Sequence, residues 1–501
     1  MIDQELVRRA TECKRPLIHK NVYPLRTVAI EQDEKAFHGL SAVPVGDVDF
    51  PLTMNRGDSL ILDFGDHCVG YLNFTVDSSP TTKIVDSPCM LKFSFGEFPL
   101  ELYRAPEEYC GTLGCGWLQN ELKRVIFTPY TNALERRYSF RYVKIERVDN
   151  AQYAIELSGV YADCVSAVEL SQAPKSPTDD EQLKRIYDMS VKTLKECEQD
   201  VFEDGPKRDR RLWIGDLRLQ ALVDYGTFRN TALVERCIYL FAAYRQKGGR
   251  VAPYVYPDSP RYIDGFFFSD YSLFFATCLY DYARAVGNMD MVRELYPIAK
   301  EQIEISRALL ERDILSFIDW CPGLDKSAAI LGVYVYVLRQ FKYLTEMLGY
   351  ATEEIDELTD KAKCALMALY SEEKGLFIGK TGQISVHSQV WGILSGVLTE
   401  EQALALAKRI GTLEIEHTPR TPYMMHYYIE ALWSVGLKDT AMDLIRNYWG
   451  KLAELGLDCC IEIFNPNDHF ESPYNAPEIN SACHAWSCTP AYWIQRYFSE
   501  K

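Results

Sequence analysis

The sequence lacks the hydrophobic segments that direct a protein into or across a membrane. Its first twenty residues contain no apolar core of the signal-peptide type, and no later run of about 18 apolar residues occurs. The 15 cysteines are an odd number, and several, such as Cys237, Cys278 and Cys364, lie on apolar helical faces, which is typical of free thiols in a reducing compartment. We therefore expect a soluble, cytoplasmic protein without a disulfide framework.

Common nucleotide-binding, metal-binding and hydrolase motifs are absent as well. The sequence has no P-loop, no GxGxxG after a predicted strand, no HExxH and no GxSxG. Its eight histidines leave few candidates for a catalytic triad, and the cysteine pairs 110/115, 459/460 and 483/488 have no second half at zinc-site spacing. We expect no cofactor and no metal. The formal charge of -17 would repel nucleic acid and anionic membranes, so the expected partner is a small neutral ligand.

The N-terminal region is predicted to be a β domain. From about residue 25 to 165, short alternating runs rich in β-branched and aromatic residues are separated by Gly, Pro, Asp and Asn. No helical pattern intervenes, so we predict an antiparallel, jelly-roll-like β-sandwich over residues 1–170. The Pro- and Ser-rich stretch Ser171–Asp180 marks the domain boundary, and Thr178 is the predicted cap of the next helix. The predicted strands are Ser59–Gly65, Gly70–Asp77, Leu91–Phe98, Val125–Tyr130 and Phe140–Val148.

Residues 171–501 have a helical period instead. Links of only a few residues at Gly287, Gly349 and Gly436 make neighbouring helices antiparallel, whereas other links are long and aromatic. Six such hairpins close into an (α/α)6 barrel with the long loops at one mouth. The rival open solenoid would show a repeat of fixed length, and none is found. The predicted helices are 179–200, 216–228, 231–246, 270–287, 290–311, 327–349, 351–370, 385–397, 399–411, 421–436, 437–455 and 484–498.

The most unusual segment is DGPKRDRRLWIGD, Asp204–Asp216, which holds three carboxylates, four cations and a Trp between two helical patterns. A solvated charged turn would have a similar composition, but loops held by a rigid scaffold often carry the chemistry of a protein. At the mouth of a barrel this segment would line one pocket together with the long loops. Further residues expected there are Tyr254, Tyr256, Phe266 to Phe268, Asp319, Trp320, Glu462, His484 and Trp486.

Carboxylates beside aromatic side chains, with no phosphate-binding loop, indicate a carbohydrate site, because aromatic faces stack on sugars and polar groups bind hydroxyls. Glycoside hydrolysis needs one protonated and one ionised carboxyl group. The arginines beside Asp209 favour its ionised form, whereas burial or a neighbouring carboxylate would favour the protonated form. Glu462 is either a site residue or the partner of a structural Arg. His484 and Trp486 are either ligand contacts or a helix cap with a core Trp.

Several motifs in a fixed order resemble the catalytic domain of bacterial α-L-rhamnosidases, glycoside hydrolase family 78. They include DGPKRDRRLWIGD, FIDWCPG, VHSQVWGILSG, CIEIFNP and CHAWSCTPAYW, and the resemblance runs from about Asp179 to the C-terminus. The preceding LDFG, LKFSFGEF and FRYVKIERV runs are similar to the β-sandwich of that family. The resemblance implies a six-hairpin barrel that releases terminal α-L-rhamnose with inversion. Because the chain stops soon after Trp493, we expect it to lack the C-terminal β-sandwich common in the family.

The same resemblance implies the roles of individual residues. It makes Asp209 the general acid and Glu462 the general base. Many relatives carry Glu where this chain has Asp209, and the shorter side chain places the acid about 1.5 Å further back. Two alternatives stay open: a six-hairpin enzyme for another sugar, such as another glycosidase or a uronate lyase, and a carbohydrate-binding relative without activity. The implied substrate-binding residues are Asp204, Arg208, Trp213 and Asp216, with Asp319, Trp320, His484 and Trp486.

Overall fold

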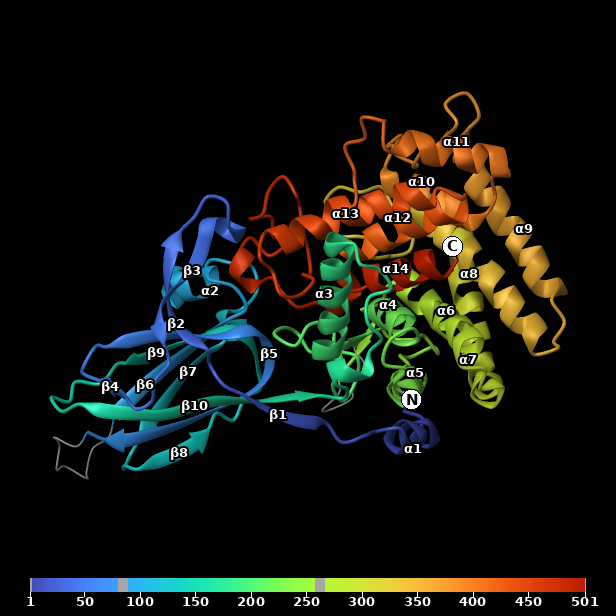
Figure 1. The fold of residues 1–501 in the computed structure, drawn as a ribbon. Helices are drawn as coiled ribbons and strands as arrows, with labels where there is room; N and C mark the ends of the chain where they lie inside the picture. The colour runs from blue at the N-terminus through green and yellow to red at the C-terminus, as the bar shows by residue number, and fades with distance from the viewer. Residues whose placement is uncertain (1, 80–88, 257–265, 501) are drawn as a thin grey trace.

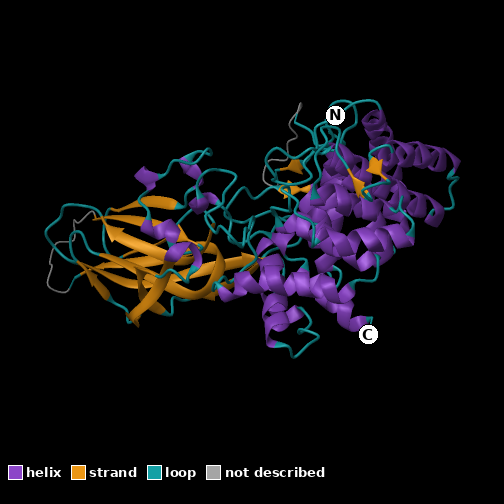
Figure 2. Ribbon diagram, turned by 90° about the horizontal axis from the view of Figure 1, so that it is seen from above, coloured by secondary structure: helices purple, strands orange, loops and turns teal. Residues whose placement is uncertain are grey.

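The computed structural model describes residues 2–79, 89–256 and 266–500. Figure 1 shows a β part, blue to teal, beside a helical part, green to red. Figure 2, seen from above, shows most of the strands gathered on one side and most of the helices on the other. The predicted order of β and helical regions is therefore observed, while the division at residue 170 stays a prediction. Residues 247–269, one of the links expected to be long and aromatic, include residues 257–265, which lie outside the described residues.

The β part is an antiparallel sheet organised around the 20-residue strand β5, which pairs with β2, β8, β9 and β10. The register between β5 and β9 shifts between Asp63 and Cys68, an irregularity of the kind that bends a strand. Its core includes Leu72, Phe74 and Phe93. The strands are β1 (Ile18–Val22), β2 (Arg26–Gln32), β3 (Leu40–Asp47), β4 (Leu52–Met54), β5 (Ser59–Ser78), β6 (Cys89–Gly96), β7 (Asn120–Val125), β8 (Tyr130–Ala133), β9 (Tyr138–Arg147) and β10 (Ile155–Ser166).

Four of the five predicted strand runs coincide with strands. The first two are parts of the single strand β5, the third overlaps β6, and the fifth overlaps β9. The predicted strand Val125–Tyr130 is wrong, because β7 ends at Val125 and β8 begins only at Tyr130. Pro129 between them has no backbone N–H to donate to a strand partner, which explains the interruption.

All twelve predicted helices are present, with ends shifted by a few residues. The first begins after Asp180, whose side chain accepts a hydrogen bond from the Leu183 N–H at 3.0 Å, and not after Thr178. The last predicted helix is corrected more strongly, because α14 begins at Pro490, a residue that suits the first helical turn. The helices are α3 (Glu181–Cys197), α4 (Ile214–Asp224), α5 (Thr231–Ala243), α6 (Ser269–Ala285), α7 (Met289–Ser306), α8 (Ser327–Met347), α9 (Glu353–Met367), α10 (Val386–Ser395), α11 (Glu400–Ile410), α12 (Pro422–Ser434), α13 (Lys438–Glu454) and α14 (Pro490–Ser499).

The helical part is a ring of buried helices covered by more exposed ones. Helices α4, α6, α8, α10 and α12 are buried on most sides, whereas α7, α9, α11 and α13 bury mainly one face. Each buried helix contacts the next, and the 3-10 turn η7 (Ala485–Ser487) contacts both α12 and α4, which closes the ring. The tight turns contain Gly287, Gly349 and Gly436, all with positive φ.

Helix α1 (Gln4–Glu12) precedes the strands but packs on α5 of the helical part (Figure 1). Its residues Leu6 and Ala10 join the helical core, and the N–H of Asp3 donates to the carbonyl of Ala243 at 3.0 Å. The chain then crosses into the sheet through β1, which pairs with the returning strand β10. Two neighbouring strands therefore connect the β part to the helical part.

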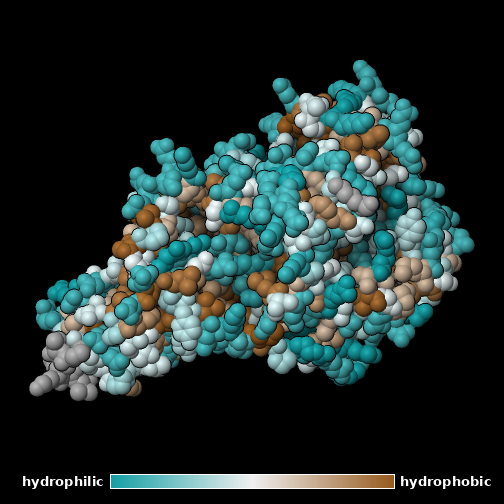
Figure 3. All heavy atoms as spheres, in the orientation of Figure 1, coloured by the Kyte–Doolittle hydropathy of each residue, from teal (hydrophilic) through white to brown (hydrophobic). Residues whose placement is uncertain are grey.

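The surface has the mixed polarity of an ordinary globular protein. Figure 3 shows a mostly hydrophilic face on which hydrophobic residues are scattered. No helix in the described part of the chain is long and apolar enough to cross a bilayer. All 15 cysteines are free.

Candidate active site

A cavity of about 300 Å³ opens among the loops at one end of the helical ring. The ten residues that the family resemblance assigns to the site all line it, and so do Phe266 and Phe268, whereas Phe267 does not. Tyr254 and Tyr256 do not line it; they lie behind it, where the Arg211 guanidinium packs over both rings at 4.6 and 4.8 Å. The lining residues are Asp204, Arg208, Asp209, Trp213, Asp216, Phe266, Phe268, Tyr271, Leu315, Ser316, Phe317, Asp319, Trp320, Lys326, Glu462, Tyr474, His484 and Trp486.

The charged segment 204–216 is buried and internally bonded, so it is not a solvated turn. The carboxylate of Asp204 accepts hydrogen bonds from the N–H groups of Asp209 at 3.4 Å and Arg211 at 3.1 Å, which curls the segment around it. Lys207 is fully buried and donates to the carbonyls of Glu478 and Asn480. A Cβ on Gly205 would lie only 2.7 Å from the Arg208 carbonyl oxygen, so this close approach requires glycine.

Asp209 lies at the edge of the cavity, and each of its two carboxylate oxygens contacts a neighbouring side chain. Its Oδ2 pairs with Arg211 Nη1 at 2.9 Å, and its Oδ1 accepts a hydrogen bond from Trp213 Nε1 at 3.3 Å. Trp213 is held by the short strand pair β11 (Leu212–Trp213) and β12 (Tyr254–Val255). Asp209 is thus positioned by two residues of its own segment.

Two further carboxyl groups lie deeper in the same cavity. Burial and the nearby negative charges of Asp209 and Asp216 raise the pKa of Asp204 well above its ordinary value. Burial and the charges of Asp209 and Glu462 do the same for the pKa of Asp216. Asp216 stands in the first turn of α4, and its buried Oδ1 has no hydrogen-bond partner among the described residues. An unpaired buried oxygen at a cavity wall is available to a ligand hydroxyl group.

Glu462 is buried and held by four hydrogen bonds. Arg208 Nη2 donates to Oε1 at 2.9 Å and Oε2 at 2.6 Å, Tyr474 OH donates to Oε1 at 2.7 Å, and the Ser481 N–H donates to Oε2 at 3.0 Å. Burial alone would raise the pKa of Glu462, but the Arg208 guanidinium and these donors outweigh it and lower the pKa below its ordinary value. Glu462 therefore pairs with an arginine and also faces the cavity, so the two alternatives considered for it do not exclude each other.

His484 and Trp486 lie in the segment before α14, not in that helix, and both face the cavity. Burial lowers the pKa of His484 to about 4, so its imidazole is neutral at pH 7. Its Nδ1 lies 3.7 Å from the unpaired Asp216 oxygen. Trp486 donates its Nε1–H to the carbonyl of Glu462 at 2.9 Å, so the indole fixes the backbone that carries this carboxylate.

Asp319 touches the cavity but its carboxylate is fully used by protein donors. It accepts hydrogen bonds from His387 Nε2 at 2.7 Å, Thr421 Oγ1 at 2.6 Å and the N–H of Arg420 at 2.8 Å. The N–H of Trp320 donates to it as well, at 2.9 Å. Asp319 thus holds the loop that presents Trp320, whose ring is 38% exposed at the cavity mouth.

Several residues of the cavity wall were not expected from the sequence. Tyr474, which stacks under the Arg208 guanidinium at 4.3 Å, lies in the run SPYNAP and has the composition of an ordinary turn. Phe317 precedes the expected Asp319 by two residues and packs against Trp486 with ring centroids 6.0 Å apart. Tyr271 belongs to a helical pattern, in which facing a site cannot be distinguished from facing the core. Lys326 is a single cation in the loop just before α8, with nothing in the sequence to mark it.

Two protein-family models match the chain. Residues 24–164 match the glycosyl hydrolase family 78 α-rhamnosidase N-terminal domain, and residues 171–498 match the bacterial α-L-rhamnosidase 6 hairpin glycosidase domain. A comparison with curated proteins gave no match.

Similar solved structures cover more than nine tenths of the chain. A rhamnosidase from Klebsiella oxytoca with rhamnose bound is 36% identical, with a TM-score of 0.94 and 99% of each chain covered. The family 78 rhamnosidase of Bacillus sp. GL1 is 22% identical, with a TM-score of 0.74, covering 91% of this chain and 49% of that one. An α-L-rhamnosidase of Streptomyces avermitilis complexed with L-rhamnose is 14% identical, with a TM-score of 0.68, covering 96% and 44%. These matches confirm the predicted fold class.

Proposed function

The chain belongs to glycosyl hydrolase family 78, the bacterial α-L-rhamnosidases, and on this basis we propose that it releases terminal α-L-rhamnose from small glycosides with inversion. The family and the match to the Klebsiella oxytoca enzyme make it a glycosidase. The main support for hydrolysis of α-L-rhamnosides with inversion is that Asp209 and Glu462, which are far apart in the sequence, line the same cavity. The 15 free cysteines of the protein support our proposal that it works in a reducing compartment.

We assign the general base to Glu462 and the general acid to Asp209. An inverting glycosidase needs an ionised carboxylate that takes a proton from water and, on the other face of the sugar, a carboxylic acid that protonates the leaving oxygen. The donors around Glu462 support its ionised form. All four lone-pair positions of this carboxylate are occupied, so one donor must shift before water can bind; Tyr474 lines the cavity and is the candidate.

Asp209 must be protonated when the glycoside is bound. Arg211 Nη1 pairs with its Oδ2 at 2.9 Å, and the carboxyl groups of Asp204 and Asp216 line the same cavity. We propose that the leaving-group oxygen displaces Arg211 from Asp209, and that the three neighbouring carboxyl groups share the proton that is then delivered. The Arg211 guanidinium remains stabilised by the two tyrosine rings beneath it.

The walls of the cavity fit a deoxy sugar. L-Rhamnose presents a methyl group where common hexoses have a hydroxymethyl, and an apolar wall would bind this methyl without leaving a hydroxyl unpaired. The apolar lining residues Phe266, Phe268, Leu315 and Phe317 could form that wall. Neutral His484 and the unpaired oxygen of Asp216 would bind ring hydroxyl groups, since each can accept a hydrogen bond.

A single set of assays tests the proposal. The wild-type protein should hydrolyse an aryl α-L-rhamnoside, and proton NMR of the first product should show the β-anomer of rhamnose. The variants Asp209→Asn and Glu462→Gln should each lose about 10²- to 10⁴-fold in kcat while circular dichroism stays unchanged. Full activity in either variant would remove the role assigned to that residue. An unsaturated, ultraviolet-absorbing product from uronate polymers would favour a lyase, and sugar binding without turnover a non-catalytic relative.

A further inference from the structure

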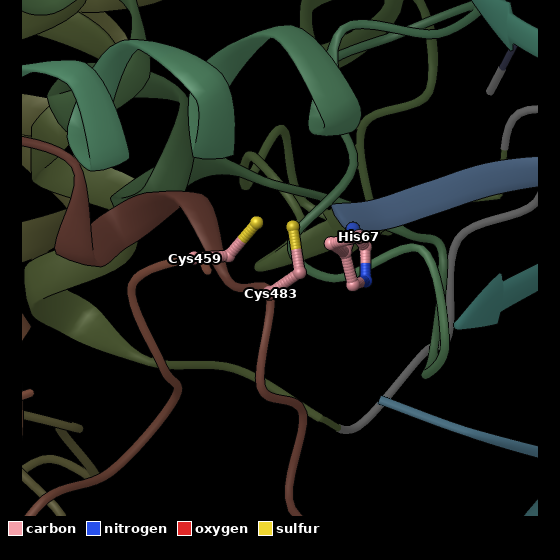
Figure 4. A group of neighbouring side chains, drawn as sticks. All are labelled: His67, Cys459 and Cys483. Atoms are coloured by element: carbon pink, nitrogen blue, oxygen red, sulfur yellow. The ribbon is translucent and has the colours of Figure 1, made fainter. Parts of the chain in front are cut away.

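A second group of reactive side chains lies outside the cavity described above. Among the residues that the structure describes, His67, Cys459 and Cys483 are all buried and bring one nitrogen and two sulfur atoms within 4.8 Å of one another. Figure 4 shows the two sulfur atoms pointing to the same side, next to the imidazole of His67. His67 belongs to strand β5 of the sheet, whereas the two cysteines belong to loops of the helical part. The group therefore spans the junction of the two parts.

The imidazole of His67 is oriented as in a metal site. Its Nε2 lies 3.2 Å from Glu97 Oε1 and 3.0 Å from Ser139 Oγ, so these two groups fix one nitrogen. The other nitrogen, Nδ1, is buried and finds no hydrogen-bond partner in the described part of the chain. In metal sites, a histidine ligand commonly binds the metal through one ring nitrogen, while a carboxylate accepts a hydrogen bond from the other ring nitrogen and orients the imidazole. His67 has this arrangement, with Nδ1 left for a metal.

The distances are close to those that a zinc ion requires. If all three separations were at the upper limit of 4.8 Å, a point at the centre of the triangle would lie about 2.8 Å from each atom. Zinc binds cysteine sulfur at about 2.3 Å and histidine nitrogen at about 2.0 Å, so inward movements of about 0.5 to 0.8 Å bring the three atoms to bonding distance. Rotation of the two cysteine side chains supplies movements of this size.

The charges also balance. Two thiolates, a neutral imidazole and Zn²⁺ have no net charge, which suits a buried position. Lys207 Nζ lies 3.7 Å from the supporting carboxylate of Glu97 and 2.9 Å from Glu101, so this cation is shared by two carboxyl groups. The bound ion with its two thiolates would itself add no net charge at the junction.

An entry path to this group is present. A cavity of about 330 Å³ between the sheet and the helical part is lined by His67, Glu97, Cys459 and Ala482. Cys483 follows Ala482 in the chain. Water in this cavity can reach the open side of the three ligands and complete a tetrahedral site.

We propose that His67, Cys459 and Cys483 bind one Zn²⁺ ion, with a water molecule as fourth ligand. The ion would join strand β5 to the two loops that carry Glu462 and His484, three residues and one residue beyond the cysteine ligands. It is a structural site: it would stabilise the junction of the two parts and the backbone of the active-site wall, and its ligands do not line the sugar cavity.

Metal content is measured first on the full chain, expressed without a histidine tag in zinc-supplemented medium and purified with a weak reductant. We expect close to one Zn²⁺ per chain in the wild type and in Cys460→Ser, a matched control whose buried sulfur neighbours Cys459 but lies outside the group. The double variant Cys459→Ser/Cys483→Ser should hold less than one tenth as much. Equal zinc in the control and in the double variant would overturn the proposal, as would a Cys459–Cys483 disulfide in a metal-free wild type.

A second measurement does not depend on variants that fold. Chelation should lower the Tm of the wild-type protein by a few degrees, and Zn²⁺ but not Mg²⁺ should restore it. Co²⁺ added to the chelated protein should give thiolate-to-metal charge-transfer absorption, because both sulfur ligands bind as thiolates. Absence of this absorption, or an unchanged Tm on chelation and on zinc addition, would contradict the site. Exposed Cys110, Cys115 and Cys364 are present in every variant, so weak surface binding cancels in the comparison.

Discussion

The contact between Arg208 and Glu462 makes a quantitative prediction about pH. Arg208 Nη2 lies 2.9 and 2.6 Å from the two oxygens of Glu462 and is the largest influence that lowers the pKa of this buried carboxyl group. Arg208→Met removes the charge and leaves burial unopposed, so the pKa of Glu462 rises. An opposite charge at this range changes a carboxyl pKa by about 1 to 3. If Glu462 is the base, the acid limb of kcat/KM moves to higher pH by the same amount.

The stability of the variant should depend on pH with the opposite sign. In the wild type, the lowered pKa of Glu462 adds stability above the ordinary pKa of 4.5, and this stability is lost as the pH falls through the folded value. In Arg208→Met the raised pKa makes the folded state less stable as the pH increases, with a loss of about 3–5 kcal/mol at neutral pH. Urea unfolding at pH 5 and pH 8 measures this change.

The conservative variant Arg208→Lys is the control, because it keeps a positive charge and should leave the acid limb near its wild-type position. Circular dichroism of both variants is the check that they fold. If the acid limbs of Arg208→Met and the wild type coincide, then Glu462 does not set this limb, and the reasoning from its ion pair to the role of a base is refuted.

Two further substitutions distinguish a residue that binds the substrate, Trp320, from a residue that supports the structure of the site, Asp319. Trp320→Ala removes an exposed aromatic wall and should raise KM about 2- to 10-fold with little change in kcat; an unchanged KM would exclude Trp320 from the site. Asp319→Ala leaves four donors without an acceptor and should cost about 3–5 kcal/mol in urea unfolding, whereas Asp313→Ala, at an exposed ion pair, should cost less than about 1 kcal/mol. Equal losses in the two variants would contradict a supporting role for Asp319.

The helical part could be predicted closely because its signals are local. Hydrophobic period, caps such as Thr399 and turn glycines such as Gly436 depend on residues a few positions apart, so α6 and α8 are found within a few residues of their predicted ends. The β part was predicted less completely. Its pairings join distant residues, and the strand β5 reads as two runs because its bend near Asp63 to Cys68 interrupts the alternation.

The cavity could be predicted as far as charge and aromaticity marked its residues. The ten residues assigned to the site by the family resemblance all face it, although their roles remain predictions, while Tyr254, Tyr256 and Phe267 do not line it. What the sequence could not give is how each carboxylate is bonded: Asp319 is saturated by protein donors, while Asp216 keeps an unpaired oxygen. The group of His67, Cys459 and Cys483 was missed for a related reason. A search for metal-ligand spacing finds neighbours along the chain, and this group assembles from a strand and two loops.

The path of the chain at its N-terminal end has a mechanical consequence. Because α1 is packed on α5 and the chain returns to the helices at α3, the whole sheet is inserted between two segments anchored on the same body. Its two connections are hydrogen-bonded to each other, as at Ile18 opposite Ser166. Two hydrogen-bonded strands, β1 and β10, resist bending and rotation of the sheet relative to the helices better than a single connecting strand would. The sheet should keep its orientation while the sugar enters and leaves.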